Sequence, residues 1–139
     1  MLRTWILLKF LEQVARQFIL VVRFAGISTG LIRLSQEGMN AGFQYEGVSF
    51  SVFARQLPGT VPLFRCVVRG SAYHFTSNDG NCEGQQQEGA YGFVSQQPRR
   101  EASRAIYRCV RGADHLTTVN PQECNAAGYR VEGGQGYAQ

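Results

Sequence analysis

The stretch LFRCV at residues 63–67 returns as IYRCV at residues 106–110, 43 positions further along the chain. A second pair of stretches, EGMNAGFQYEG at 37–47 and ECNAAGYRVEG at 123–133, is separated by 86 positions, which is twice 43, and is identical at five of its eleven positions. A fixed period of this kind is typical of repeat architectures. The sequence therefore predicts three units of about 42 residues, which run over about 20–61, 62–104 and 105–139.

Each unit contains three or four short stretches of strand-forming residues, and turn residues separate these stretches. We therefore expect an all-β fold with a single three-repeat domain over 19–139. A β-trefoil-like three-fold arrangement suits three such units, because closure removes exposed sheet edges. A β-sandwich is the alternative, although it does not require a three-fold repeat.

The N-terminal segment, residues 1–18, differs from the rest of the chain. Its polar residues Lys9, Glu12 and Arg16 recur at three- and four-residue steps, which is the pattern of an amphipathic helix. The segment, helical or extended, could pack on the domain or mediate self-association with a neighbouring copy, serve as an imperfect export signal, or lie on a membrane surface. Charged residues interrupt the apolar run, so we expect no transmembrane span.

The four cysteines fall into the second and third units only. Cys66 and Cys82 are 16 residues apart, Cys109 and Cys124 are 15 apart, and the first unit lacks both equivalents. Two cysteines that are absent together from one unit are expected to be bonded to each other in the units that contain them. The repeat therefore predicts the disulfides Cys66–Cys82 and Cys109–Cys124. Zinc is the rival explanation, but structural zinc sites usually bring their ligands in closely spaced pairs. Two disulfides indicate an extracellular location.

Composition and charge limit the classes of function that the chain can have. Hydrophobic residues make up 44% of the chain and charged residues 17%, which is typical of a globular protein. The net charge is +4, but +3 of it lies in residues 1–24 and only +1 in residues 25–139. Because the body of the chain is almost neutral, we expect no nucleic-acid partner.

Several of these stretches resemble an uncharacterised family of secreted repeats. The stretches are LFRC and IYRC, then YHFT at 73–76 and DHLT at 114–117, then FQYEG at 43–47. The family pattern is Tyr-Arg, then His-Phe-x-Thr, then Tyr-x-Tyr-Glu-Gly, and the resemblance covers about residues 37–139. It implies a trefoil-like fold and an extracellular location, often beside catalytic or adhesive domains, but no particular activity.

Catalytic motifs are missing from the sequence. The chain has two histidines and no Gly-x-Ser-x-Gly, phosphate loop or His-Glu-x-x-His motif, and the predicted disulfides leave no thiol. Glu46 and Glu132 are equivalent in the repeat, so we expect them to lie apart and to form turns beside the glycines that follow them. We therefore expect no enzyme, no cofactor and no metal.

The two histidines are the candidates for a binding site. One alternative is that each hydrogen-bonds to a neighbouring turn. The other is a shallow polar pocket in each of units two and three, in which His, Asp or Asn bonds sugar hydroxyls and a tyrosine stacks on the ring. Arg65 and Arg108 could be structural or could line the same pockets. The candidate ligand-binding residues are Tyr73, His74, Asn78, Tyr91, Asp114, His115, Asn120 and Tyr129.

The sequence thus favours a secreted, non-enzymatic, lectin-like module that recognises glycans or another extracellular surface. A structural subunit of an extracellular assembly or filament is the alternative, and a protease inhibitor is a third.

Overall fold

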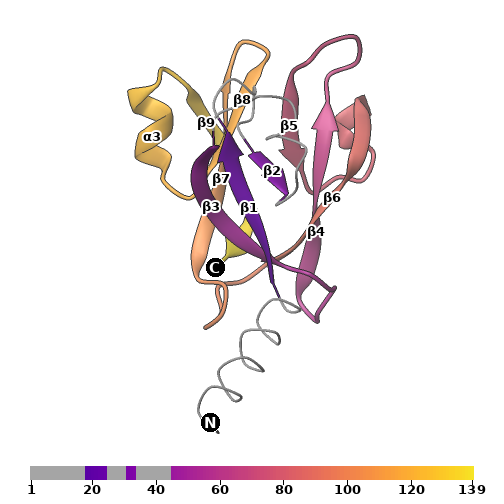
Figure 1. Ribbon diagram of the computed structural model, residues 1–139, viewed down its shortest axis with the longest axis vertical. Coiled ribbons are helices and arrows are strands. Elements are labelled where there is room, and N and C mark those ends of the chain that lie inside the picture. The colour runs from indigo at the N-terminus through magenta and orange to yellow at the C-terminus, as the bar shows by residue number, and fades with distance from the viewer. Residues whose placement is uncertain (1–17, 25–30, 34–44) are drawn as a thin grey trace, which may run out of the picture.

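The structure, a computed structural model, describes residues 18–24, 31–33 and 45–139 (Figure 1). All but the last residue of the predicted N-terminal segment, 1–18, lies outside the described residues. The described chain is predominantly β, as the sequence predicts. Its strands are β1 (Phe18–Phe24), β2 (Leu31–Arg33), β3 (Tyr45–Phe53), β4 (Thr60–Val67), β5 (His74–Ser77), β6 (Gln86–Ser95), β7 (Arg104–Arg111), β8 (Asp114–Thr118) and β9 (Arg130–Ala138). Two short helices, η1 (Cys82–Gly84) and α3 (Pro121–Ala126), precede β6 and β9.

The strands form three successive trios with the same connectivity. In each trio the first strand pairs antiparallel with both the second and the third, so that it lies between them: β1 with β2 and β3, β4 with β5 and β6, and β7 with β8 and β9. The pairing between first and third strands shifts register immediately after Val21, Leu63 and Ile106. Such shifts bend a strand, which lets the sheet curl.

The third strands of the three trios meet one another. Phe53 of β3 pairs with Phe93 of β6, and Ser95 of β6 pairs with Tyr137 of β9. Ser51 of β3 and Gln139, which follows β9, exchange two backbone N–H···O bonds of 3.1 Å. These junctions join the trios into one curled antiparallel sheet that resembles half a barrel (Figure 1).

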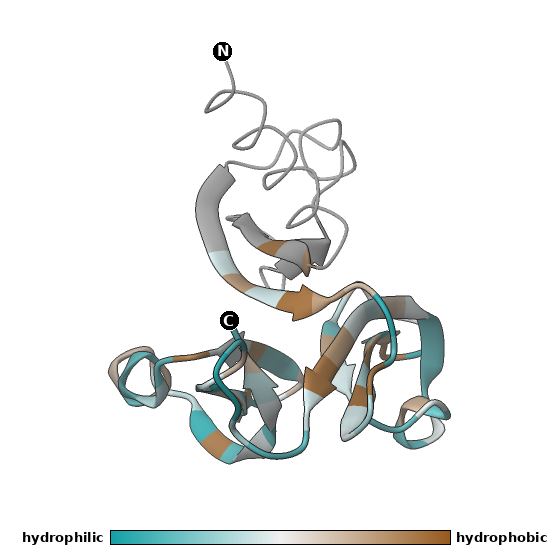
Figure 2. Cartoon of the chain, turned by 90° about the horizontal axis from the view of Figure 1, so that it is seen from below, coloured by the Kyte–Doolittle hydropathy of each residue, from teal (hydrophilic) through white to brown (hydrophobic). Residues whose placement is uncertain are grey.

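The core lies where the trios meet. Val21, Leu63 and Ile106 hold matching positions on the first strands and are completely buried. The third strands add five buried residues to the same cluster: Phe50, Val52, Tyr91, Val94 and Ala138. Hydrophobic segments lie along the strands in Figure 2, and the loops at the sides are mostly hydrophilic.

Both predicted disulfides are confirmed. Cys66 of β4 is bonded to Cys82 of η1, and Cys109 of β7 is bonded to Cys124 of α3. These bonds use all four cysteines of the chain, so none of them is left for the zinc alternative. Two disulfides are consistent with an extracellular protein.

Among the described residues, the helices are too short and too polar to cross a membrane.

Two glycines allow the third strands to approach closely. A Cβ atom at Gly136 would lie 2.7 Å from the Cγ2 of Val94 and 2.9 Å from the carbonyl oxygen of Ser95. A Cβ atom at Gly92 would lie 2.6 Å from the Cγ2 of Val52. Any side chain at these positions would push neighbouring strands apart.

We predict that Gly136→Ala destabilises the fold by about 2–4 kcal/mol, because the methyl group would clash and the backbone has a positive φ of 121°. Gly134→Ala on the same strand is the matched control, since its Cβ would lie no closer than 3.8 Å to another atom, and we expect a change within about 0.5 kcal/mol. Urea unfolding of both variants measures the difference. Equal destabilisation by the two substitutions would contradict the close approach.

We also predict that replacing Cys66 and Cys82 together by alanine costs about 3 kcal/mol, because the disulfide closes a loop of 16 residues in the unfolded chain. The Cys109 and Cys124 pair, with a loop of 15 residues, should give a similar loss. The measurement is the free energy of unfolding from urea titration, with midpoint and slope both fitted because the unfolded chain changes as well. Unchanged free energies of unfolding would show that the bridges add nothing to stability.

Candidate functional site

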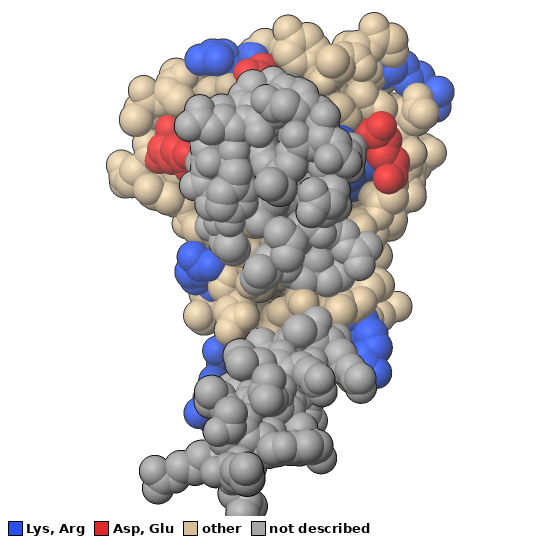
Figure 3. Space-filling model, viewed as in Figure 1, with Lys and Arg blue, Asp and Glu red and all other residues tan. Residues whose placement is uncertain are grey.

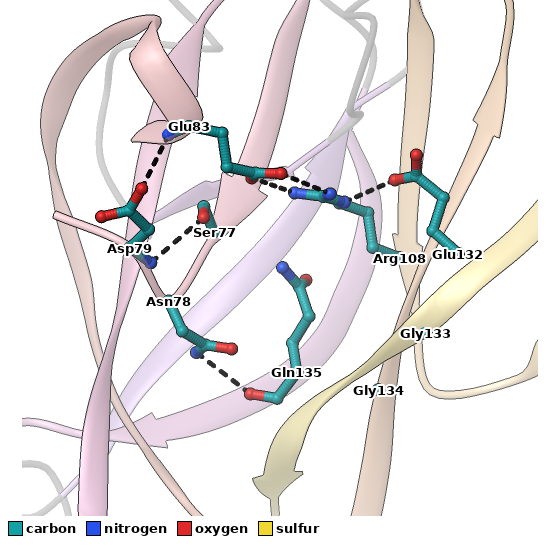
Figure 4. A pocket seen from close by; sticks show the side chains of 9 residues that line it. All are labelled: Ser77, Asn78, Asp79, Glu83, Arg108, Glu132, Gly133, Gly134 and Gln135. Atoms are coloured by element: carbon teal, nitrogen blue, oxygen red, sulfur yellow. Dashed lines mark hydrogen bonds and ion pairs between the residues drawn. The ribbon is translucent and has the colours of Figure 1, made fainter. Parts of the chain in front are cut away.

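A polar pocket of about 300 Å³ lies between the second and third trios (Figure 4). The end of β5 and the segment that leads to η1 form one side, and β7 and β9 form the other. Its lining residues are Ser77, Asn78, Asp79, Glu83, Arg108, Glu132, Gly133, Gly134 and Gln135. The pocket therefore exists only because two trios pack against each other.

Arg108 of β7 lies at the centre of the hydrogen bonds in this pocket. Its two terminal nitrogens donate to the two carboxylate oxygens of Glu83, at 2.6 and 3.0 Å. Its Nε donates to Glu132 at 2.6 Å, and its Nη1 also donates to the carbonyl oxygen of Thr76 at 2.9 Å. The guanidinium is packed against the ring of Phe75, 5.6 Å from the ring centre. One arginine thus ties both trios together.

This ion pairing shifts the titration of the groups involved. The hydrogen bonds from Arg108 lower the pKa of Glu83, and burial opposes that shift in part. The same bonds, made to Glu83, raise the pKa of Arg108. Glu83 therefore stays ionised to a lower pH than an unpaired glutamate, and Arg108 stays protonated to a higher pH than an unpaired arginine.

Several constraints hold Glu83 in place. Cys82 and Glu83 have positive φ angles of 51° and 55°. Residues other than glycine rarely adopt this backbone conformation. The carboxylate of Asp79 accepts the backbone N–H groups of Asn81 at 2.9 Å and Glu83 at 3.0 Å. Together with the disulfide from Cys82 to Cys66, these bonds compensate for the unfavourable backbone conformation.

Glu132 reaches Arg108 because β9 carries a bulge. The register passes from Arg108 opposite Gly133 to Cys109 opposite Val131, so Glu132 is the extra residue. A bulge redirects a side chain away from the regular pleat. Glu132 therefore lies in a strand, and the turn role that the sequence suggested for it is wrong.

Two side-chain amides of the pocket lining, the buried Gln135 and the exposed Asn78, hydrogen-bond to the backbone. Gln135 is only 8% exposed; its Nε2 donates to the carbonyl oxygen of Thr76 at 2.7 Å, and its Oε1 accepts from the Thr76 hydroxyl. Asn78 donates both to the carbonyl oxygen of Pro62 at 3.0 Å and to that of Gln135 at 3.1 Å. In Figure 4 the Gln135 side chain points between Ser77 and Arg108.

The two predicted histidines each lie beside a glutamate and an arginine. His74 is 2.7 Å from Glu88, and Arg65 is 3.4 Å from the same carboxylate oxygen. In the third unit, His115 is 3.7 Å from Glu132, the carboxylate that also accepts from Arg108. The pairing of the histidines with glutamates was missed in the sequence. Glu-Gly occurs at five places in the chain, and the three at 46–47, 88–89 and 132–133 are 42 and 44 residues apart; that spacing is the signal that could have found it.

The remaining predicted site residues are dispersed. Tyr91 is 2% exposed and lies in the core, whereas Tyr73 is 44% exposed and does not line the pocket. The Asn120 side chain accepts from the backbone N–H of Gln122 at the start of α3. Among the predicted residues only Asn78 lines the pocket.

Tyr129 and Asp114 form a separate cluster. The Tyr129 hydroxyl donates to the Asp114 carboxylate at 2.6 Å, and the guanidinium of Arg111 lies 4.5 Å from the centre of the tyrosine ring. Arg111 therefore covers one face of the tyrosine ring. Within residues 18–24, 31–33 and 45–139, no group of three or more His, Cys, Asp and Glu side chains has the arrangement of a metal site.

We predict that acid destabilises the fold in two pH ranges. Burial lowers the pKa of His115 below its ordinary value of 6.5, so the unfolded chain binds this proton more readily and stability falls as the pH drops below that value. The lowered pKa of Glu83 acts in the same direction below 4.5. Urea unfolding of His115→Gln should show a smaller loss than the parent between pH 7 and 5, and Glu83→Gln a smaller loss below about pH 4.5. Parallel pH profiles for parent and variants would contradict both assignments.

A family model described as a domain of unknown function (DUF5648) matches residues 35–139. No curated protein and no solved structure matches the chain. The matched region contains both disulfides, the pocket and every strand from β3 onward. It agrees with the expectation of an uncharacterised domain family. Because the match covers most of the chain, this protein belongs to the DUF5648 family.

Proposed function

We propose that this protein is a secreted, non-enzymatic module that binds a glycan in the pocket between the second and third trios. The observation that supports this proposal is the convergence of three carboxylates, two amides and one hydroxyl on one open pocket, beside two glycines that leave room. Carboxylates and amides form directional hydrogen bonds with sugar hydroxyls. The two disulfides support secretion.

The rigidity of the lining supports a binding role. Glu83 is held by two bonds from Arg108 and by a backbone that Asp79 and a disulfide restrain. Gln135 is buried and hydrogen-bonded. When the lining groups are already in position, binding a ligand loses little of their conformational entropy. The affinity is higher for that reason.

The lowered pKa of Glu83 supports a role other than catalysis for this carboxylate. A general acid at neutral pH needs a raised pKa, as in many glycosidases. The pKa of Glu83 is lowered instead, because Arg108 donates to both of its oxygens. A carboxylate that is paired in this way is better suited to accept hydrogen bonds than to transfer a proton.

We also propose that the three trios form a trefoil-like repeat. The junctions Phe53–Phe93, Ser95–Tyr137 and Gln139–Ser51 support this, because each joins the third strand of one trio to that of the next at corresponding positions. The three register shifts after Val21, Leu63 and Ile106 fall at corresponding positions as well. In such an arrangement a pocket between two trios is a natural place for a ligand.

We predict that a glycan array identifies a ligand, and that Glu83→Gln weakens its binding about tenfold, because a charged acceptor is lost. Glu101→Gln is the matched control, since Glu101 is exposed and does not line the pocket. Isothermal calorimetry gives the affinities, and circular dichroism checks that both variants are folded. The proposal fails if no glycan binds, or if folded Glu83→Gln and Glu101→Gln bind as tightly as the parent.

A further inference from the structure

The pocket has an unbalanced charge. Its lining contains the carboxylates of Asp79, Glu83 and Glu132 but only the single guanidinium of Arg108, which gives a formal charge of −2. The whole chain carries +4, so the sign of the pocket is opposite to that of the protein. The charged side chains visible in Figure 3 lie in small separate groups. Because salt screens charges beyond about 8–10 Å, a bound ligand responds mainly to the lining itself.

The positive group in the pocket is already engaged. Arg108 makes four hydrogen bonds, two to Glu83, one to Glu132 and one to the backbone of Thr76. A ligand carboxylate or sulfate would have to displace one of these carboxylates and would meet the negative charge of the others. The pocket therefore offers an anion little compensation for its lost water.

The remaining lining groups are mainly acceptors. Asn78 donates twice to backbone carbonyls, and the Gln135 amide donates to Thr76, so these donors are directed into the protein. The carboxylates retain acceptor positions, since each has about four and the protein uses only some of them. Glu83 and Glu132 are also accessible, with 45% and 26% of their side chains exposed. Such a pocket complements a ligand that is rich in donors.

We propose that this pocket selects glycans that carry a protonated amine and discriminates against glycans that carry a carboxylate or a sulfate, an inference that rests on the proposed glycan-binding function. An ammonium group brings three N–H donors and a positive charge, and the sugar hydroxyls add further donors. These donors match the acceptors of the lining, and the positive charge matches its negative charge. The lowered pKa of Glu83 keeps this selectivity at mildly acidic pH.

The test compares three oligosaccharides of equal length: a glucosamine oligomer, its N-acetylated form and a galacturonic acid oligomer. Calorimetry at low ionic strength, at a pH where the amine is protonated, should show that the glucosamine oligomer binds about tenfold tighter than the acetylated one. The galacturonic acid oligomer should bind most weakly. Added salt should reduce the preference for the amine.

Two variants assign the preference to the pocket. Glu83→Gln should reduce the tenfold preference to about threefold or less, because one negative charge is removed. Glu101→Gln, which removes one exposed carboxylate outside the pocket, should leave the preference unchanged. An equal reduction in both variants would show that general charge, and not the pocket, causes the preference, and would overturn the inference.

The outcomes separate the two proposals. If the acetylated oligomer binds as tightly as the glucosamine oligomer, or the acidic oligomer binds best, charge selection is overturned while glycan binding stands. If none of the three oligomers and no other glycan binds, both proposals are overturned.

Discussion

The close crossing of the third strands β3, β6 and β9 is the constraint on which the rest of the structure depends. At each crossing a small residue meets a larger one: Gly92 lies against Val52, and Gly136 lies against Val94. At the third crossing the sizes are reversed, because the corresponding residues are Phe50 and Ala138, both of which belong to the core cluster. The third crossing thus holds a larger total side-chain volume than the other two, and its larger residue comes from the opposite strand.

The pocket is a consequence of that crossing. Glu83 belongs to the second trio and Arg108 to the third, so their bonds form only when the trios are held in a fixed relation. The disulfide at Cys82 then fixes the segment that carries Glu83, and the bulge at Glu132 supplies the second carboxylate. Covalent, backbone and packing constraints therefore act on one small group of side chains, which holds the pocket lining in a fixed geometry.

The parts of this structure that repeat were predictable, and the parts that depend on the contact between trios were not. The period of about 43 residues, with both cysteines absent from the first unit, led to the strand-rich fold and to the correct disulfides. Glu83 carried no such signal: no repeat partner marks it, and its left-handed backbone follows from local hydrogen bonds. Tyr91 was expected beside a ligand, but its bulge position turns the ring into the core.

The same bulge carries different side chains in the second and third trios. Tyr91 and Gln135 are the extra residues at corresponding bulges of β6 and β9, where the register shifts after Leu63 and Ile106 respectively. The tyrosine fills the core, whereas the amide lines the pocket and bonds Thr76 of the neighbouring trio. A single substitution at one repeated position therefore exchanges packing for hydrogen bonding. The second and third trios thus share one backbone plan, while the pocket lies at the boundary where the polar Gln135 occupies this bulge position.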